Sequence, residues 1–422
     1  MNCESFGSCG SCTLGEPYED QILYKKRLIG DKLREFFDGE FEFFASQPQN
    51  YRIRAEFGIW HDIWHSAFDL AYTMGGARSK KILINECPKV VLPIANLMPR
   101  LLEALRRSEA LKERLFGVEF ISCASGILAT LLYHKRLGKR EQEAICELAD
   151  KLGIRVMARA RGQKLLSGEL SLTDELCVDG RVYKFRFGEN AFIQPNRGVN
   201  EKMIAWARSC VDFGKKGMGG VCAAQNSVTR NSIVENFTEQ NSRYEQSAPQ
   251  NLSCEKHAVR SENSAARDLL ELYCGHGNFT IPLAAKFNRV LASEISKSSI
   301  ANARINCELN GVCNAQFVRL SADELMSAFA RRREFERLKG IDIFSYDFSH
   351  VLIDPPRAGL EPSVIDFIKN FQNLIYISCN PQTLFENLRS LCATHEVRRF
   401  AIFDQFAHTA HIECGVLLRR RS

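Results

Sequence analysis

The sequence predicts an α/β protein with a doubly wound C-terminal domain and an N-terminal α+β region. Two observations predict the C-terminal domain: apolar strand-like runs alternate regularly with helical patterns after residue 266, and glycine or proline turns follow several of these runs. A third observation sets the first half apart, because its strands and helices do not alternate strictly. We therefore divide the chain into residues 1–200, a connecting segment at 214–265 and residues 266–422.

The N-terminal region opens with an amphipathic helix. Between residues 16 and 37, apolar side chains recur among charged ones at helical spacing. Leucines and arginines at the same spacing predict a second helix within 92–115, and a third is expected at 140–152. Strands are expected at 51–60, 117–124, 127–134 and 154–159.

The connecting segment differs in composition from both flanking regions. Residues 214–265 begin with Gly-Lys-Lys-Gly-Met-Gly-Gly and continue with many Asn, Ser, Gln and Glu but few large apolar residues. Such a stretch buries too little apolar surface to offset the entropy of ordering it. We expect a linker or insertion without regular structure.

The C-terminal region alternates strand and helix, and this order is typical of a doubly wound sheet with helices on both faces. Ligands of such sheets bind outside the carboxyl ends of the strands. Strands are expected at 268–273, 290–293, 315–319, 350–353, 374–378, 397–403 and 411–418, and helices at 278–287, 297–309, 361–370 and 382–391.

Composition restricts the compartment and the partners. The chain has no apolar run long enough to span a bilayer, and its N-terminus lacks the basic and apolar regions of a signal peptide. Sixteen cysteines in a chain of 422 residues point to free, ligating or core thiols in a reducing compartment rather than to a disulfide framework. We expect a cytoplasmic protein with no membrane partner. The formal charge of +6 permits a nucleic-acid partner without requiring one.

A strand, a glycine turn and a helix follow one another near residue 275. Gly275 and Gly277 allow the backbone to approach a ligand closely, and the next strand ends at Glu294, a position from which acidic residues bind ribose hydroxyls. The third glycine of a dinucleotide fingerprint is absent. The sequence therefore favours an adenosyl ligand without a pyrophosphate, such as S-adenosylmethionine, in a class I (Rossmann-like) methyltransferase domain. Residues 273–278 would surround its amino-acid end.

Two further turns carry reactive groups. An apolar strand delivers Cys379 to an Asn-Pro turn, and the preceding strand ends in Asp354-Pro-Pro-Arg357. Methyltransferases that modify amino groups have an aromatic residue where this chain has Arg357. A nucleophilic cysteine beside that turn favours attack at a ring carbon. The alternative for Cys379 is a buried structural thiol.

These motifs together resemble the tRNA (uracil-5-)-methyltransferase family. Besides the glycine turn and the C-terminal motifs, the matching segments are Tyr-Arg-Ile-Arg-Ala-Glu-Phe at 51–57, Leu-Tyr-His-Lys at 132–135, Gln-Pro-Asn at 194–196 and Arg-Glu-Phe-Glu-Arg-Leu-Lys-Gly-Ile-Asp at 333–342. The resemblance covers nearly the whole chain apart from the connecting segment. It implies methylation of C5 of the T-loop uridine at position 54 of tRNA, giving 5-methyluridine.

The resemblance also implies residue roles. Cys379 would add to C6 of uracil, and Glu413 would remove the C5 proton after methyl transfer. Partial burial of Glu413 would raise its pKa toward a useful range. The target base would have to leave its stack, and the N-terminal region would bind the T arm of tRNA with basic residues. The cofactor contacts implied are Gln194, Tyr273, Asn278, Glu294 and Asp354, and the basic candidates are Arg52, Arg54 and Lys135.

Four cysteines depart from the tRNA branch of this family. Cys3, Cys9 and Cys12 have the spacing Cys-x5-Cys-x2-Cys, and Cys87 stands far downstream before a proline. This set resembles the iron–sulfur signature of the ribosomal-RNA branches, and four cysteines are the usual ligands of a [4Fe-4S] cluster. A zinc site and a frayed N-terminus with free thiols are the alternatives.

The cysteine signature leaves other functions open. Methylation of a ribosomal-RNA uridine is one alternative, and an RNA-folding chaperone of the same fold is another. His408 and His411 near Glu413 do not have the helical spacing of zinc ligands, so we expect no metal there. No obligate protein partner is evident.

Overall fold

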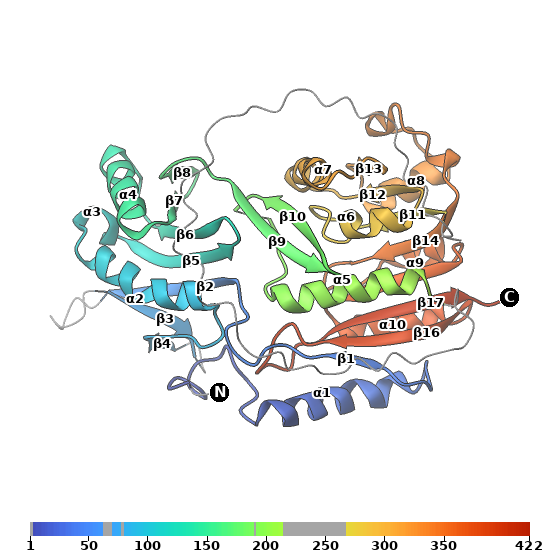
Figure 1. The fold of residues 1–422 in the computed structure, drawn as a ribbon, viewed down its shortest axis with the longest axis horizontal. Coiled ribbons are helices and arrows are strands. Elements are labelled where there is room, and N and C mark those ends of the chain that lie inside the picture. Colours follow the sequence, from blue (N-terminus) through green and yellow to red (C-terminus); the bar gives the residue numbers. More distant parts are fainter. Residues whose placement is uncertain (1–2, 62–69, 77–79, 190, 214–266) are drawn as a thin grey trace.

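Two β-sheets joined by a hairpin form the protein (Figure 1). The computed structural model describes residues 3–61, 70–76, 80–189, 191–213 and 267–422. The connecting segment predicted at 214–265 lies outside these residues. In the described part of the chain, no helix combines the length and the apolar character needed to cross a membrane.

The larger sheet has eight strands in the order β1-β16-β17-β15-β14-β11-β12-β13. Its strands run parallel except for β17, which is antiparallel to both of its neighbours. After β11 the chain builds the sheet first on one side through β12 and then on the other through β14. The order of strands therefore reverses between β11 and β14, where ligands of such sheets bind. The strands are β1 (Glu42–Phe44), β11 (Asp268–Leu272), β12 (Arg289–Ser293), β13 (Ala315–Val318), β14 (Phe348–Ile353), β15 (Asn373–Ser378), β16 (His395–Phe403) and β17 (Glu413–Arg420).

Helices cover both faces of this sheet, because its central strands are apolar on both sides. One core lies under α1 (Tyr18–Leu33), α8 (Ala322–Phe329), α9 (Pro362–Ile368) and α10 (Pro381–Leu391). The opposite core lies under α5 (Arg197–Val211), α6 (Thr280–Leu283) and α7 (Lys297–Asn310). Successive side chains of β11 alternate between them, with Leu269 in the second core and Leu270 in the first.

The smaller sheet has seven strands in the order β4-β3-β2-β5-β6-β7-β8. Its pairs are antiparallel except β6 with β7, which α4 connects as a crossover. Helices α2 and α4 bury one face of it. The elements are β2 (Arg54–His61), β3 (Leu70–Gly75), β4 (Lys81–Ile84), β5 (Leu115–Cys123), β6 (Gly126–Tyr133), β7 (Arg155–Ala160), β8 (Gln163–Leu166), α2 (Leu92–Arg106), α3 (Glu109–Lys112) and α4 (Lys139–Leu152).

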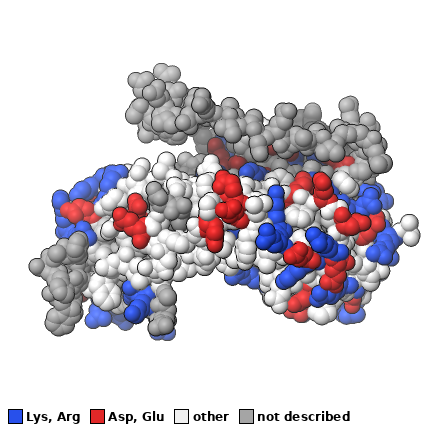
Figure 2. Space-filling view, turned by 90° about the horizontal axis from the view of Figure 1, so that it is seen from below, with Lys and Arg blue, Asp and Glu red and all other residues white. Residues whose placement is uncertain are grey.

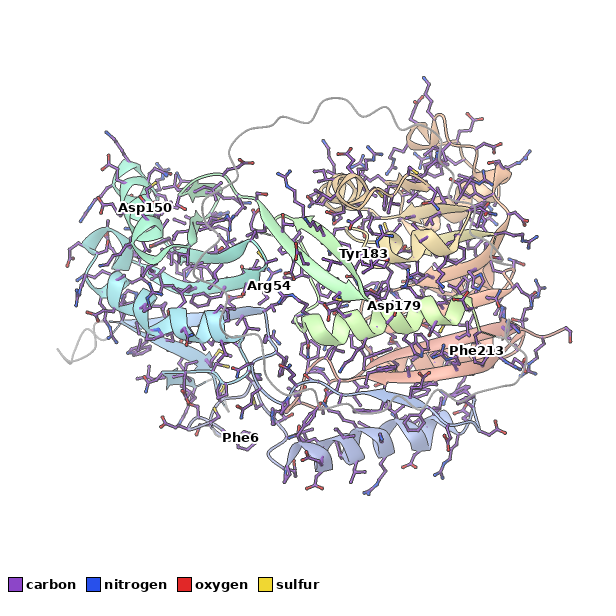
Figure 3. All side chains as sticks on the ribbon, viewed as in Figure 1. Phe6, Arg54, Asp150, Asp179, Tyr183 and Phe213 are labelled. Carbon is purple, nitrogen blue, oxygen red and sulfur yellow. The ribbon has the colours of Figure 1, made fainter. Side chains whose placement is uncertain are left out.

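A hairpin of β9 (Leu172–Val178) and β10 (Arg181–Phe187) links the two sheets. Its turn is Asp179-Gly180, and both residues have positive φ, as two-residue hairpin turns require. Leu172 packs in a small core with residues of the smaller sheet, whereas Tyr183 belongs to the core under α5. Figure 3 shows Tyr183 toward the larger sheet and Arg54 toward the smaller one.

The predicted mixed α/β architecture is confirmed, with differences in detail. The helix expected within 92–115 is two helices, because Ser108 adopts an extended conformation between α2 and α3. The sequence reading missed the β9–β10 hairpin and helices α5 and α8. It also placed residues 1–200 apart from the larger sheet, whereas β1 pairs with β16 in that sheet and α1 packs on its core.

Charge is mixed over the surface. On the face shown in Figure 2, basic and acidic side chains lie next to one another instead of forming a continuous patch of one sign. Over the described residues, several charged side chains form exposed ion pairs, such as Arg389 with Glu35 and Arg398 with Glu396. Pairs of this kind contribute little to stability.

Candidate active site

Three ionisable groups gather at the ends of β14, β15 and β17. Asp354 follows β14 and Cys379 follows β15, and these strands are parallel neighbours, so their carboxyl ends lie at one edge. Glu413 begins the antiparallel β17, where Ser378 is registered with Cys414. One step further along this register places Cys379 beside Glu413. We call Cys379, Asp354 and Glu413 the cysteine–carboxylate cluster.

The turn after Cys379 is fixed by its own side chains. Asn380 caps α10 by accepting a hydrogen bond from the backbone N–H of Gln382, and Pro381 is the first helical residue. The Asn380 amide donates to the carbonyl of Arg357 at 3.0 Å, which ties this turn to the Asp-Pro-Pro-Arg turn. Cys379 therefore lies just before a helix N-terminus, where a thiolate is favoured.

Burial and mutual repulsion oppose ionisation of the cluster. Burial, followed by the neighbouring Asp354 charge, raises the pKa of Glu413 to about 8, and burial raises the pKa of Asp354 to about 7. Burial and then both carboxylates raise the pKa of the Cys379 thiol, while Arg357 lowers it. A carboxyl group of this kind can hold a proton or release it near neutral pH.

Arg357 lies at the exposed side of the cluster and donates a hydrogen bond to Nδ1 of His411 at 3.1 Å. His408 lies elsewhere: it is buried, its Nδ1 is 3.0 Å from Nε2 of Gln21, and its Nε2 donates to the carbonyl of Pro48. In the part of the chain that the structure describes, no three His, Cys, Asp or Glu side chains are grouped to hold a metal ion. His408 instead contacts the Pro48 backbone and the Gln21 side chain through these hydrogen bonds.

The glycine turn at 273–279 joins β11 to α6 at the same edge of the sheet. Tyr273, Gly275 and Gly277 have φ of 62°, 56° and 90°, so the turn needs three left-handed residues. Tyr273 accepts that conformation although it has a side chain. A Cβ at Gly275 would meet nothing within 4 Å, which leaves the backbone open to a ligand there.

Glu294 lies at the end of β12 and holds this turn. Its carboxylate accepts hydrogen bonds from the N–H of Gly275 at 3.1 Å and from the N–H of Ser296 at 2.8 Å. Each carboxylate oxygen keeps a further acceptor site for ribose hydroxyls. Glu294 therefore lies next to the glycine turn and shapes it, and its contact with a ribose stays a prediction.

Gln194 and Asn278 line one cavity beside the glycine turn, together with His276 and Asn200. The Asn278 and Asn200 amides exchange two hydrogen bonds of 2.9 and 3.0 Å. Gln194 is 8% exposed, and its side-chain oxygen is buried without a hydrogen-bond partner among the described residues. An unpaired buried carbonyl is costly unless a ligand donates to it. The sequence reading missed Asn200, although an asparagine on an otherwise apolar helix face was visible.

Glu271 was also missed. It lies in β11 below the glycine turn, fully surrounded, and accepts a hydrogen bond of 2.6 Å from the Thr280 hydroxyl. Burial raises its pKa to about 8. The sequence contained the signal, since an acidic residue interrupts a run of leucines in a strand buried on both faces.

The profile of the tRNA (Uracil-5-)-methyltransferase family matches residues 17–219 and 225–421. The tRNA/tmRNA (uracil-C(5))-methyltransferase of Campylobacter concisus (strain 13826) is 54% identical over 422 residues, and the alignment covers both chains completely. The chain belongs to the tRNA (uracil-5-)-methyltransferase family. The enzyme of the same name from Acinetobacter baylyi is 38% identical over 411 residues, covering 96% of this chain and 99% of that protein.

A solved structure has the same fold. The Pyrococcus abyssi tRNA (uracil-54, C5)-methyltransferase, crystallised in complex with S-adenosyl-L-homocysteine, superposes with a TM-score of 0.62. The match covers 95% of this chain and 83% of that one at 18% identity. At this identity the match supports the mixed α/β fold, while membership in the tRNA (uracil-5-)-methyltransferase family follows from the profile and the relatives.

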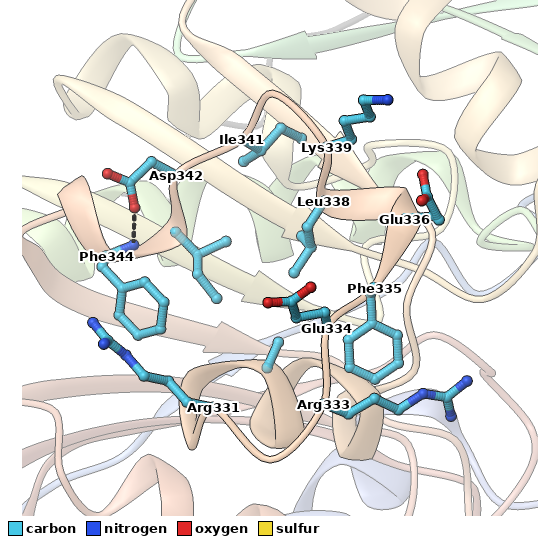
Figure 4. A pocket seen from close by; sticks show the side chains of 12 residues that line it. Arg331, Arg333, Glu334, Phe335, Glu336, Leu338, Lys339, Ile341, Asp342 and Phe344 are labelled. Carbon is cyan, nitrogen blue, oxygen red and sulfur yellow. Dashed lines mark hydrogen bonds between the residues drawn. The ribbon is translucent and has the colours of Figure 1, made fainter.

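The segment at 333–342, one of those that resemble the tRNA (uracil-5-)-methyltransferase family, lines a pocket that none of the cysteine–carboxylate cluster residues lines. This pocket has a volume of about 640 Å³ and lies between α8 and β14 (Figure 4). There Arg331 stacks on Phe344 at 4.5 Å and Arg333 on Phe335 at 5.0 Å. The lining also holds Glu334, Glu336, Lys339 and Asp342. Its charges balance, so it does not favour an anion.

The four N-terminal cysteines meet in one place. Cys3, Cys9, Cys12 and Cys87 line a small pocket of about 20 Å³ beside Lys89. Burial raises the pKa of the Cys12 and Cys87 thiols, and the Lys89 ammonium lowers both. Among the described residues no such group is arranged to hold a metal ion, so this arrangement supports neither the zinc alternative nor the predicted iron–sulfur cluster, which stays a prediction.

Proposed function

We propose that this protein methylates C5 of the T-loop uridine at position 54 of tRNA, with S-adenosylmethionine as the methyl donor. The observation that carries the proposal is the register of β15 and β17, which sets the thiol of Cys379 beside the carboxylate of Glu413. A nucleophile and a base on neighbouring strands suit addition to and elimination from one pyrimidine ring. Membership in the family supports the same reaction.

The first chemical role falls to Cys379. C5 of uracil is a weak nucleophile until a covalent bond at C6 places electron density on it. The Cys379 thiolate adds to C6, and C5 becomes an enolate-like carbon. The nearby Arg357 and the N-terminus of α10 favour the thiolate. S-adenosylmethionine, when bound, supplies the methyl group that C5 takes.

Glu413 completes the reaction. Once C5 carries the methyl group, the carboxylate removes the remaining C5 proton, the C5–C6 double bond reforms and the C6–S bond breaks. This step returns Cys379 as the thiolate and leaves Glu413 protonated. A pKa of about 8 makes Glu413 a stronger base than an exposed glutamate and still leaves part of it ionised at neutral pH.

The residues around the glycine turn fit the methyl donor. The unpaired side-chain oxygen of Gln194 can accept a hydrogen bond from the ammonium group of S-adenosylmethionine. Glu294 has acceptor sites left for the ribose hydroxyls. Asn278 lines the same cavity as Gln194. We assign the donor to Gln194, Tyr273, Asn278, Glu294 and Asp354.

RNA recognition is the less defined part of the proposal. Uridine 54 must leave its stack to reach Cys379, and the T arm would lie against the smaller sheet. Two of the predicted basic contacts already have acidic partners: Arg54 pairs with Glu119, and Lys135 pairs with Glu113 and Glu141. Arg52 stacks on Phe406 and has no acidic partner among the described residues, which supports it as the strongest of the three candidates.

The test compares substrates directly. Methyl transfer from labelled S-adenosylmethionine would be measured on an unmodified tRNA transcript, the same tRNA with cytidine at position 54, and ribosomal RNA. We expect product on the first alone. Product on ribosomal RNA alone would show that ribosomal RNA, and not tRNA, is the substrate. Retained RNA binding without any product would favour the RNA-folding chaperone. With 5-fluorouridine RNA, whose C5 has no removable proton, we expect a denaturant-stable protein–RNA adduct.

We also propose that Cys3, Cys9, Cys12 and Cys87 hold a [4Fe-4S] cluster. Four thiols line this pocket together with the Met74 thioether and the Glu86 carboxylate, and four cysteine thiolates are the usual ligands of such a cluster. Lys89 adds a second reason. It is 4% exposed, donates to Ser11, and forms no ion pair among the described residues, so four thiolates would supply its missing counter-charge. Such a cluster would join the N-terminal segment to the smaller sheet.

Anaerobic purification with iron and sulfide analysis tests the cluster. We expect about four irons for each chain, with visible absorbance that Cys87→Ser removes and that Cys313→Ser, at an exposed thiol, retains. Colourless, iron-free protein from anaerobic cells would end the idea. The proposed methylation chemistry would be unaffected by that result.

A further inference from the structure

Helix α1 buries a stripe of four side chains, Gln21, Lys25, Ile29 and Leu33. Their spacing of four residues puts them on one face of the helix. Ile29 and Leu33 pack into the core of the larger sheet, as expected for an amphipathic helix. Gln21 and Lys25 are polar, yet they are buried just as deeply. The polar half of the stripe therefore needs its own explanation.

Lys25 and Asp404 form a buried ion pair. The Lys25 ammonium lies 2.6 Å from the Asp404 carboxylate, and both side chains are 0% exposed. Among the ion pairs of the described residues, this is the one in which both partners are fully buried. Lys25 also donates to the carbonyl of Phe406 at 3.1 Å, and the Tyr18 hydroxyl donates to the second Asp404 oxygen at 2.7 Å.

All these contacts reach one loop, residues 404–412, which joins β16 to β17 and ends directly before Glu413. The same helix face holds the loop further along, where the Gln21 amide accepts from the N–H of His408 at 2.9 Å. His408 has φ of 64°, a left-handed conformation that is strained for a residue with a side chain. The loop is thus kept in a shape that it would not adopt alone.

Stability alone does not account for this arrangement. Desolvating two charges offsets most of their attraction, and apolar residues of similar volume are often as stabilising. The pair instead fixes the position of the loop, because Lys25 holds both the Asp404 carboxylate and the Phe406 carbonyl. The loop also carries His411, which accepts from Arg357 beside Cys379. The α1 face therefore contacts the loop that leads into β17 and that carries His411, the partner of Arg357.

We propose that Lys25 is a positioning residue for the base: by fixing the 404–412 loop, it holds Glu413 where it can take the C5 proton from the adduct. This inference rests on the proposed function. Cys379 lies between β15 and α10, and the Asn380 amide ties this turn to the Arg357 carbonyl, a contact that Lys25 does not make. Loss of Lys25 should therefore slow release of the methylated product more than it slows formation of the adduct.

The test separates the two steps in a single turnover. Labelled tRNA is mixed with excess enzyme and S-adenosylmethionine, and denaturing gels follow the appearance and decay of the protein–RNA adduct. For Lys25→Met we expect decay to slow by about tenfold or more and appearance to change by less than about twofold. Lys32→Met, on an exposed position of the same helix, is the matched control and should match the wild type.

A second variant guards against simple destabilisation. Lys25→Met leaves Asp404 as an unpaired buried charge, which would lower stability. Adding Asp404→Asn removes that charge and should restore much of the melting temperature without restoring the decay rate. If decay recovers together with stability, or if appearance and decay fall equally, the role of Lys25 is structural and the inference fails. A wild-type enzyme that forms no adduct with 5-fluorouridine tRNA in the presence of S-adenosylmethionine would overturn the proposed function itself.

Discussion

The glycine turn and the cysteine–carboxylate cluster lie at the same edge of one sheet, but the surroundings of their polar groups differ. Around the glycine turn, Glu294 accepts two backbone hydrogen bonds, and the Asn278 and Asn200 amides satisfy each other. In the cluster, Glu413 is buried and Cys379 is partly buried, both lie near carboxylates, and both have raised pKa values. Binding a ligand requires a preformed frame, whereas bond making requires groups that gain by changing their protonation or bonding state.

The largest effect is expected from a substitution in the cysteine–carboxylate cluster that leaves the glycine turn unchanged. Cys379→Ala removes the nucleophile and should reduce methyl transfer by about 10⁴-fold or more, because no other group can activate C5. Binding of S-adenosylmethionine, measured by calorimetry, should remain within about twofold, since the alanine leaves the glycine turn intact. Cys313→Ala, at an exposed thiol, is the control. Substantial methylation by Cys379→Ala would contradict the covalent route.

Glu413→Gln should separate addition from elimination. The amide keeps the shape of the side chain but cannot take a proton, so turnover should fall by about 10²- to 10⁴-fold. The adduct should then accumulate with unmodified tRNA, visible as a slow band on a denaturing gel. Glu308→Gln, at an exposed position of α7, should leave both readouts unchanged. Loss of the adduct in Glu413→Gln would mean that the residue acts before elimination.

The pH dependence of adduct decay should report the raised pKa of Glu413. A base works when ionised, so below a pKa of about 8 the decay rate should rise with pH, giving a gain of about fiftyfold between pH 6 and 8. Single-turnover decay of the adduct across this range checks the slope. A decay rate independent of pH would show that the carboxylate is already ionised at pH 6.

The smallest effect is expected from a substitution at Glu294, beside the glycine turn. Glu294→Gln retains a side-chain oxygen but loses one acceptor and the charge, so the KM for S-adenosylmethionine should rise by about tenfold while kcat changes little. Initial rates at saturating tRNA provide both constants. Glu361→Gln, an exposed residue at the start of α9, is the control. A fall in kcat with an unchanged KM would show that Glu294 acts in the chemical step and not in binding S-adenosylmethionine.

Local sequence patterns carried most of the fold and the main site residues. Strand-turn-helix patterns located Gly275, Cys379 and Asp354 because each turn follows its own strand directly. The hairpin was missed although its alternating strands and Asp-Gly turn were visible. The 333–342 segment was recognisable in sequence, yet it lines a separate pocket with balanced charges.

The sequence by itself determined which groups are present and which turns display them, because secondary structure follows from periodicities of two and 3.6 residues. Only the tertiary structure decided which of them meet. The antiparallel β17 sets Glu413 beside Cys379, and burial then shifts their pKa values. Lys25 and Asp404 are 379 residues apart in the chain and meet only because α1 packs against the end of the sheet. Such contacts depend on packing between distant segments, which no local pattern encodes.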